Sequence, residues 1–209
     1  MMKLEAPERD VPVIPPVLRL PPAALLVVAG VPGAGKTTLL ARVDAPESLV
    51  LDPEPVRARY QRLLGRAPYR WWRPLVHAEH FLRVLLALPG RSGLVVHDTG
   101  TRGWRRRLLA RLADRFGRTG HLLFLDVPAR VALEGQRRRR RRALRRSAFA
   151  THWHSWHELR TALTAPAATE VPGPGDPDPS GLRAEGWRSV RLVDRPAADR
   201  LRRVVIPRR

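Results

Sequence analysis

The sequence predicts an α/β fold: a doubly wound, five-stranded parallel sheet flanked by helices. Two observations indicate it. Apolar runs bounded by turn residues alternate along the chain with segments that repeat apolar residues at helical spacing. Four of the apolar runs also end at a residue suited to chemistry, namely Gly30, Asp52, Asp98 and Asp126. Functional residues of such sheets gather at the carboxyl ends of the strands, so these positions mark the expected site.

The expected strands follow from their composition. Residues 24–29 are wholly apolar and end at Gly30, as expected of a strand that is buried on both faces. Four further runs complete the sheet, at residues 48–51, 94–97, 122–125 and 187–193.

The helices are expected between the strands, where apolar residues recur at helical spacing. In residues 105–116, for example, Leu108, Leu112 and Phe116 share one face. A helix is also expected to begin at Thr38, directly after a glycine-rich segment. The remaining expected helices are residues 54–64, 75–88, 129 through the arginine run at 137–142, 153–163 and 197–205.

Composition divides the chain into an N-terminal arm and one domain. Residues 1–22 are rich in proline and form the arm, and residues 23–209 form the domain. Within the domain we expect a helical lid at 129–165 and a flexible loop at 166–181, where Pro, Gly and Asp predominate. The chain has no cysteine, no apolar stretch long enough to span a bilayer, and a charged beginning unlike a signal peptide. We therefore expect a cytoplasmic protein without a membrane partner.

Residues 30–37 read Gly-Val-Pro-Gly-Ala-Gly-Lys-Thr and fit G-x-x-x-x-G-K-[ST], the phosphate-binding loop of nucleoside triphosphate enzymes. Lys36 is one of only two lysines among 39 lysine and arginine residues. A compact ammonium group on a flexible stem reaches the β- and γ-phosphates inside a tight loop, which a planar guanidinium fits poorly. The Thr37 hydroxyl is expected to bind Mg²⁺. The residues expected to bind the nucleotide are Gly30, Val31, Pro32, Gly33, Ala34, Gly35, Lys36, Thr37 and Thr38.

With this loop, Asp98 and the segment Asp126-Val127-Pro128 in place, the chain resembles the P-loop kinases of the polynucleotide kinase and zeta-toxin type, which are often grouped with AAA-family ATPases. The resemblance runs from about residue 25 to residue 163. It also rests on an acidic residue three positions before Arg57 and on a strand that ends in Asp-Thr. The resemblance implies a P-loop NTPase fold with the kinase-like strand order 2-3-1-4-5, numbered along the chain, and an arginine-rich helical lid.

The resemblance further implies roles for individual residues. The position of Glu54 is usually an aspartate that acts as general base on the acceptor hydroxyl, and Asp52 lies two residues earlier, so either carboxylate is a candidate base. Arg57 would hold a phosphate or carboxylate of the acceptor. Asp98 would position Mg²⁺ through water or orient the acceptor.

The arginine run at residues 137–142 would supply the lid. Arg139 and Arg142 share one helix face, and they are the arginines expected to neutralise charge that develops during phosphoryl transfer. Two other interpretations of the run stay open: a solvated basic helix and a face that docks RNA.

Each carboxylate also has a structural interpretation. Asp52 precedes a helix and can cap it. Asp98 can serve turn geometry at the end of its strand. Asp126 we interpret as structural, because Asp-Val-Pro opens a helix and proline suits the first helical turn.

Together these features predict a Mg²⁺-dependent phosphotransferase that moves the γ-phosphate of ATP to a hydroxyl acceptor, with ATP and Mg²⁺ as cofactors. A nucleic-acid end, a nucleoside or another small molecule would serve as acceptor. The net charge of +20 leaves nucleic acid open as a partner, although dispersed arginines also fit GC-rich coding. The alternative hypothesis is an ATP-gated RNA-binding or regulatory ATPase with little or no transferase activity. The arginine run and the aromatic segment Tyr69–Arg73 favour it.

Overall fold

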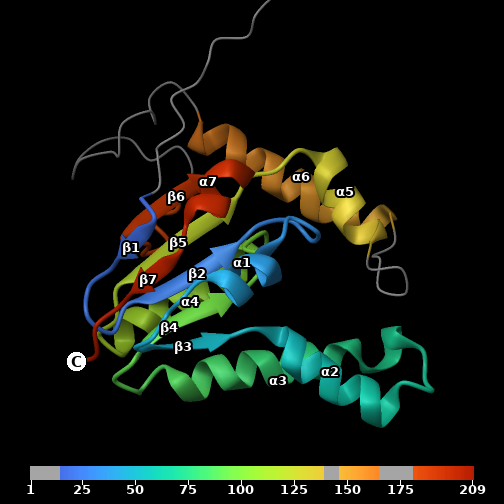
Figure 1. The fold of residues 1–209 in the computed structure, drawn as a ribbon, viewed down its shortest axis with the longest axis horizontal. Coiled ribbons are helices and arrows are strands. Elements are labelled where there is room, and N and C mark those ends of the chain that lie inside the picture. The colour runs from blue at the N-terminus through green and yellow to red at the C-terminus, as the bar shows by residue number, and fades with distance from the viewer. Residues whose placement is uncertain (1–14, 139–145, 165–180) are drawn as a thin grey trace, which may run out of the picture.

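The computed structural model describes residues 15–138, 146–164 and 181–209 (Figure 1). A five-stranded parallel sheet forms its centre, in the order β3-β4-β2-β5-β6. When these strands are numbered among themselves along the chain, the order is 2-3-1-4-5, so the predicted fold class and strand order are confirmed. The strands are β2 (Leu25–Ala29), β3 (Ser48–Leu51), β4 (Gly93–His97), β5 (Gly120–Leu125) and β6 (Ser189–Val193).

The register of the central strand brings the carboxyl ends of its neighbours to the same edge of the sheet. Val27 of β2 pairs with Val96 of β4 on one side and with Leu122 of β5 on the other. All four strand pairings in this sheet are parallel. The residues that follow the strands therefore share one edge, where ligands bind in open α/β sheets.

Helices pack around the sheet, and two groups of them flank the site edge (Figure 1). α2 and α3 pack together beside β3, whereas α5 and α6 lie on the side of β5 and β6. The helices are α1 (Lys36–Arg42), α2 (Pro53–Leu64), α3 (Tyr69–Ala87), α4 (Gly103–Arg115), α5 (Ala129–Arg137), α6 (Arg146–Leu163) and α7 (Arg195–Arg200).

Two helices begin six or more residues earlier than the sequence pattern predicts, because tertiary packing extends them. α3 begins at Tyr69 rather than at residue 75, and Trp72 in its added turn packs with Val56 of α2. α6 begins at Arg146 rather than at residue 153, and its Phe149 is buried in the main core. Burial of these rings stabilises helical turns that the periodicity alone does not indicate.

A second, two-stranded parallel sheet adds a strand within the predicted arm and shortens the predicted terminal helix. It pairs β1 (Val17–Arg19) with β7 (Arg203–Val205). The arm predicted at residues 1–22 therefore includes a strand. The terminal helix predicted at 197–205 is correct only as far as residue 200, because α7 ends at Arg200 and the strand β7 follows. The β-branched residues Val204 and Ile206 are buried in the core, and such residues favour strands.

The core lies within the sheet and beneath α6. β2 and β5 are buried along their whole length. Trp156 of α6 is fully buried, and its ring stacks on Phe124 of β5 with the ring centroids 4.8 Å apart. This contact holds α6 against the sheet, so the residues one turn before Trp156 lie close to the site edge.

Arg118 lies just before β5, near the amino-terminal ends of the strands, and is buried with only 3% of its surface exposed. Its guanidinium donates hydrogen bonds to five backbone carbonyls. The acceptors are Ala23 O at 2.6 Å, Leu88 O at 2.6 Å, Ser92 O at 2.8 Å, Gly90 O at 2.5 Å and Ala87 O at 3.4 Å. One side chain therefore ties the end of α3 to the starts of β2 and β4.

The predicted flexible loop lies almost wholly outside the described residues, and so do the first residues of the arm. Among the helices that the structure describes, none combines the length and the apolar character that crossing a membrane requires.

Candidate functional site

The loop at residues 30–35 connects β2 to α1 at the carboxyl edge of the sheet. Gly35 is the N-cap of α1 and has a φ of 100°, a left-handed conformation that favours glycine. The first backbone hydrogen bond within the helix runs from Leu39 N to Gly35 O, at 2.9 Å. The amide groups of Lys36, Thr37 and Thr38 precede that bond. They have no carbonyl partner within the helix, as the amides of an anion-binding helix start require.

Buried apolar residues of the loop anchor it to the protein core. Val31 and Ala34 are buried with 0% and 1% of their surface exposed. Gly30 N donates to Thr99 O at 3.0 Å, which fixes the loop to the segment after β4. Pro32 O accepts a hydrogen bond from Nε2 of Gln136 at 3.0 Å.

α5 packs directly on the loop through two glycines. A Cβ atom built on Gly33 would lie within 3.0 Å of the backbone of Ala132, and one built on Gly135 would lie within 3.0 Å of the Gly33 carbonyl oxygen. Only residues without a side chain permit this approach. The sequence analysis did not identify Gly135 or Gln136 as part of the site, since their roles depend on how α5 crosses the loop.

Lys36 is buried, with 4% of its surface exposed. Its ammonium group donates to Gly30 O at 2.6 Å and to Val31 O at 3.1 Å. These acceptors belong to the loop itself, so the predicted phosphate-binding lysine lies inside the predicted phosphate cradle. Thr37 follows it in the first turn of α1. Its hydroxyl has no hydrogen-bond partner among the described residues, which fits a group that would bind a metal ion.

Asp98 lies at the end of β4 and is 7% exposed. Its Oδ1 accepts a hydrogen bond from Gly100 N at 2.9 Å, and its Oδ2 forms an ion pair with Arg105 at 2.8 Å. The Asp98 side chain therefore stabilises the turn at the strand end and also pairs with an arginine of α4. Arg105 of α4 is a partner that the sequence analysis did not identify.

Asp52 caps α2, the structural interpretation considered above. Its Oδ1 accepts from Glu54 N at 2.7 Å. Its Oδ2 accepts from Nδ1 of His97 at 3.1 Å, so the carboxylate joins β3 to β4 at the site edge. Burial lowers the pKa of His97, and the hydrogen bond to Asp52 opposes that shift.

Glu54 and Arg57 form an ion pair within the first turns of α2. Nε of Arg57 also donates to Glu54 Oε2 at 3.0 Å. The expected acceptor-binding arginine and one candidate base are therefore held together. The predicted roles of both residues stay predictions.

α6 contributes a histidine to the region that follows the end of β4. Thr101 Oγ1 and His152 Nδ1 are 2.8 Å apart. Burial lowers the pKa of His152, and the charges of Arg102 and Arg73 lower it further. The sequence analysis assigned no role to Arg102 or His152 and considered Arg73 only within the aromatic segment Tyr69–Arg73, because the three residues belong to segments that are distant along the chain.

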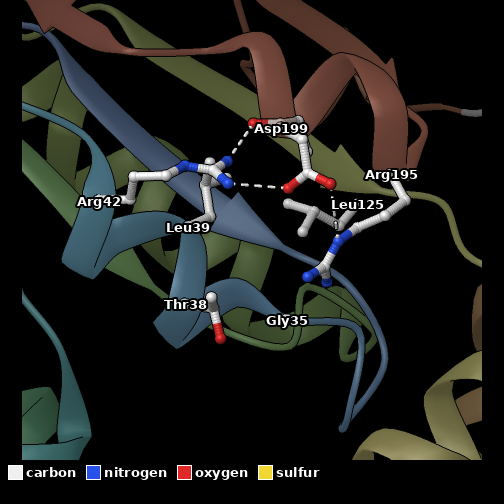
Figure 2. Close-up of a pocket in the computed structure, with 8 residues that line it drawn as sticks. Gly35, Thr38, Leu39, Arg42, Leu125, Arg195 and Asp199 are labelled. Atoms are coloured by element: carbon white, nitrogen blue, oxygen red, sulfur yellow. Dashed lines mark hydrogen bonds and ion pairs between the residues drawn. The ribbon is translucent and has the colours of Figure 1, made fainter.

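A pocket lies between α1 and α7, on the side of the loop that is next to the end of β5 (Figure 2). Asp199 bridges two arginines there. Its Oδ1 accepts from Arg42 at 2.8 Å, and its Oδ2 accepts from Nε of Arg195 at 3.3 Å. The Arg195 guanidinium lies against the position that a Cβ atom on Gly35 would occupy. The pocket is lined by Gly35, Thr38, Leu39, Arg42, Leu125, Arg195, Ala198 and Asp199.

Asp126 accepts a hydrogen bond from Nε of Arg160 at 2.6 Å, a contact that ties α6 to the end of β5. Arg139 and Arg142, the arginines expected from the lid, lie outside the described residues. Within those residues, no group of three or more His, Cys, Asp or Glu side chains is arranged to hold a metal ion.

Comparisons with known proteins agree with this architecture. A family model described as an AAA domain matches residues 25–166. No curated protein sequence matches the chain.

Solved structures provide the second comparison. The fold is similar to a structure from the PezAT chromosomal toxin–antitoxin system of Streptococcus pneumoniae, with 11% identity and a TM-score of 0.56 over 86% of this chain and 69% of that chain. A protein described as a kinase from Chloroflexus aurantiacus has 16% identity and a TM-score of 0.47, over 82% of this chain and 84% of that one. A gluconokinase from Sinorhizobium meliloti has 17% identity and a TM-score of 0.42, over 85% and 86%. Because the AAA-domain model covers more than half of the sequence, the chain belongs to this AAA-domain family, and its fold is that of a P-loop kinase-like domain.

Proposed function

We propose that the protein is a Mg²⁺-dependent phosphotransferase that moves the γ-phosphoryl group of ATP to a hydroxyl group of an acceptor. One observation carries the proposal: the loop that bears Lys36 lies between two polar regions of different character. The pocket beside Arg195 lies on one side, and the cluster around Asp98 lies on the other. A transferase needs such a division, with nucleotide on one side of the transferred group and acceptor on the other.

The loop would bind the triphosphate through the amides at the start of α1 and through Lys36. The Lys36 ammonium donates to two loop carbonyls, and it would exchange these hydrogen bonds for charge-assisted ones to phosphate oxygens. The nucleoside would lie on the side of the loop where the Arg195 guanidinium approaches Gly35. The Thr37 hydroxyl would hold Mg²⁺, with Asp98 acting through water. When bound, Mg²⁺ neutralises charge on the phosphate oxygens.

In the transfer step the acceptor oxygen forms a bond to the γ-phosphorus while the bond from that phosphorus to the β,γ-bridging oxygen breaks. ADP leaves with the bridging oxygen, and the proton of the acceptor hydroxyl passes to a carboxylate. Asp52 and Glu54, at the start of α2, are the two candidate carboxylates for this proton. Lys36 would stabilise the charge that develops on the departing phosphate, as would the arginines Arg139 and Arg142 of the lid.

Two substitutions identify the base. Asp52→Asn retains a side chain that caps helices well, so the fold of α2 is preserved while the proton acceptor is lost. Glu54→Gln removes the other carboxylate. Loss of a general base lowers kcat by about 10²-fold or more, and the variant that shows this loss identifies the base. If neither variant slows transfer by more than about tenfold, general-base catalysis by these carboxylates is wrong.

The proposed function is tested with γ-labelled ATP, Mg²⁺ and a panel of hydroxyl acceptors, with Lys36→Met as the control. We expect the label in an acceptor with the native chain and no transfer with the variant, while circular dichroism shows both to be folded. Equal transfer by the variant would refute the assigned site. ATP hydrolysis with the label found only in inorganic phosphate would favour the alternative, a regulatory or RNA-binding ATPase.

A further inference from the structure

α3 carries apolar side chains on the face that points to solvent as well as on the face that it buries. Its buried side chains recur every four residues, at Trp72, Val76, His80 and Val84. On the opposite face, apolar residues recur at intervals of three or four positions and are exposed. We call these residues the outer stripe: Trp71, Leu75, Ala78, Leu82 and Leu86. A surface helix ordinarily presents charged and polar residues on that face.

The outer stripe is strongly exposed along its length. Trp71 is 66% exposed and Leu86, at the other end, is 72% exposed. Ten large hydrophobic side chains are exposed in the part of the chain that the structure describes, and eight of them belong to β3, α2 and α3. α3 runs along the outer edge of the molecule, beyond β3 (Figure 1). Single exposed leucines are normal on a protein surface, whereas a row of apolar side chains over about four helical turns marks an interaction site.

Glu79 connects one border of the outer stripe to α2. It lies four residues after Leu75 and three before Leu82, so it adjoins both of them on the helix surface. Its carboxylate forms an ion pair with Arg59 of α2, and its Oε1 pairs with Nε of Arg83 at 3.1 Å. These two contacts place two guanidinium groups along the border of the stripe.

Further arginines extend this positive border. Arg62 lies one turn after Arg59 on α2, and both side chains are exposed. The guanidinium of Arg70 lies over the ring of Trp71, 5.7 Å from the ring centroid, at the start of the stripe. Glu79 is the only acidic residue of α3. Four arginines and one glutamate therefore border the stripe, which gives the border a net positive charge.

The composition of the stripe and its border distinguishes between classes of partner. A second copy of this chain would bring two arginine-bordered stripes together in a two-fold interface, where like charges repel. A nucleic acid would gain from the arginines and from Trp71, but leucine side chains offer a base no stacking surface. An amphipathic helix buries its own apolar residues on a stripe of this spacing, and acidic residues beside them would pair with the arginines.

We propose that the outer stripe of α3 is the docking site for an acidic amphipathic helix of another protein. The leucine, isoleucine or valine residues of that helix would pack on the stripe, while its Asp and Glu side chains would pair with Arg59, Arg62 and Arg83. This inference does not depend on the proposed phosphotransferase function. The helix that the partner would cover nevertheless contacts the site edge, because His80 Nε2 donates to the His97 carbonyl at 3.0 Å.

The first test measures whether the stripe binds a helix of this composition. The probe is a synthetic peptide of about four heptads with leucine at positions a and d and glutamate at e and g, whose mutual repulsion keeps the peptide monomeric. Two matched peptides are the controls: one has lysine in place of glutamate, and the other has the acidic composition in scrambled order. In calorimetry at physiological salt we expect a Kd on the order of 10 µM for the acidic peptide and values at least about tenfold higher for both controls. Equal binding of the scrambled peptide would show nonspecific attraction to a basic protein and overturn the proposal.

Substitutions at exposed positions test the stripe itself. Leu75→Ser/Leu82→Ser removes two apolar side chains from its centre, and Trp104→Ser removes an exposed apolar side chain from α4 as the control. We expect the double variant to weaken binding of the acidic peptide by at least about tenfold and the control to leave it within about twofold, with both folded by circular dichroism. Unchanged binding by a folded Leu75→Ser/Leu82→Ser protein would overturn the assignment.

A charge reversal tests the border. Arg62→Glu/Arg70→Glu should weaken binding of the acidic peptide by at least about tenfold and strengthen binding of the lysine peptide. Arg111→Glu/Arg115→Glu makes the same change of charge at exposed positions on α4 and should do neither. Equal effects of the two double variants would indicate the field of the whole protein and overturn the proposal.

Two measurements test the other classes of partner. In analytical ultracentrifugation we expect a monomer, and a dimer that dissociates in Leu75→Ser/Leu82→Ser would assign the stripe to a second copy and overturn the proposal. Binding of the acidic peptide should persist in the presence of a uridine oligonucleotide. Displacement of the peptide by that oligonucleotide, with loss of oligonucleotide binding in Trp71→Ala, would assign the stripe to nucleic acid and also overturn the proposal.

Discussion

Substitution of Gly135 by alanine tests how α5 meets the phosphate loop. In the interior of an ordinary helix this change stabilises by about 1 kcal/mol, because alanine loses less backbone entropy than glycine. Gly135 is not in an ordinary position, because the added Cβ would lie within 3.0 Å of the Gly33 carbonyl oxygen. The opposing atom is backbone, so either α5 or the loop must move. Overpacking of this kind costs about 1–3 kcal/mol, which cancels or reverses the propensity gain.

The larger effect is expected on ATP binding. Displacement of the Gly33 peptide moves the backbone amides that would hold the phosphates, and a misplacement of about 1 Å at a site costs on the order of 10²-fold. We therefore expect Gly135→Ala to raise the Kd for ATP by about 10–100-fold with a stability change between about 0 and 2 kcal/mol. Calorimetric titration of ATP and urea unfolding measure the two quantities.

Gly103→Ala is the matched control. Gly103 begins α4, and the closest atom to its added Cβ is a guanidinium nitrogen of Arg107 at 3.0 Å, the far end of a flexible side chain. We expect this variant to bind ATP as the native chain does. A Gly135→Ala protein that is about 1 kcal/mol more stable and binds ATP normally would refute the described contact between α5 and the loop.

Three further predictions concern stability and nucleotide binding. Arg118→Ala removes five hydrogen bonds from buried carbonyls, and we expect a loss of about 3–5 kcal/mol in the free energy of unfolding by urea; a loss below about 1 kcal/mol would contradict the described role. Burial, aided by Arg191 and Arg188, lowers the pKa of His121 from 6.5 to about 4, so the unfolded chain binds a proton before the folded chain does. The contribution of His121 to the free energy of unfolding is then fully present above pH 6.5, and about 3 kcal/mol of it is lost as the pH falls to about 4. The variant His121→Gln should lose less free energy of unfolding over this range than the native chain, and equal losses would argue against a buried neutral ring. Arg195→Ala should raise the Kd for ATP by about tenfold in calorimetric titration, because its guanidinium lies beside Gly35, and an unchanged Kd would exclude it from the nucleotide site.

The parts of the fold that sequence predicts well are those with strong local signals. A wholly apolar segment before Gly30 predicts β2, and the motif that ends in Lys36 and Thr37 predicts the loop and the start of α1. The carboxyl ends of β3 and β4 carry Asp52 and Asp98, as expected, and the structure brings both to one edge of the sheet. Hydrophobic periodicity and turn-forming residues determine these features, and both are local properties of the chain.

The features that sequence did not predict depend on contacts between distant segments. Whether residues 203–205 continue a helix or form a strand depends on pairing with residues 17–19, far away along the chain. His152 lies in a helix without a site motif, and its contact with Thr101 depends on packing such as that of Trp156 on Phe124. The position of Arg195 was a signal present in the sequence. Asp194, the N-cap of α7, follows β6, and Arg195 comes next, at the edge of the sheet where ligands bind.

The chemical role of Asp52 shows why residue identity alone does not assign function. As expected of a residue before a helix, it caps α2, yet its second oxygen accepts a hydrogen bond from His97. The same carboxylate thus meets the structural interpretation and remains in the region where an acceptor would bind. Only the Asp52→Asn variant, in which the cap is preserved, separates the two roles.

The measurement that tests the central claim most directly is the ratio of phosphorylated acceptor to ADP formed along one progress curve with γ-labelled ATP and Mg²⁺. A phosphotransferase predicts a ratio close to one, with both products absent for Lys36→Met. A ratio close to zero across the acceptor panel, with every ADP matched by inorganic phosphate, would contradict the account and identify a nucleotide-hydrolysing module instead.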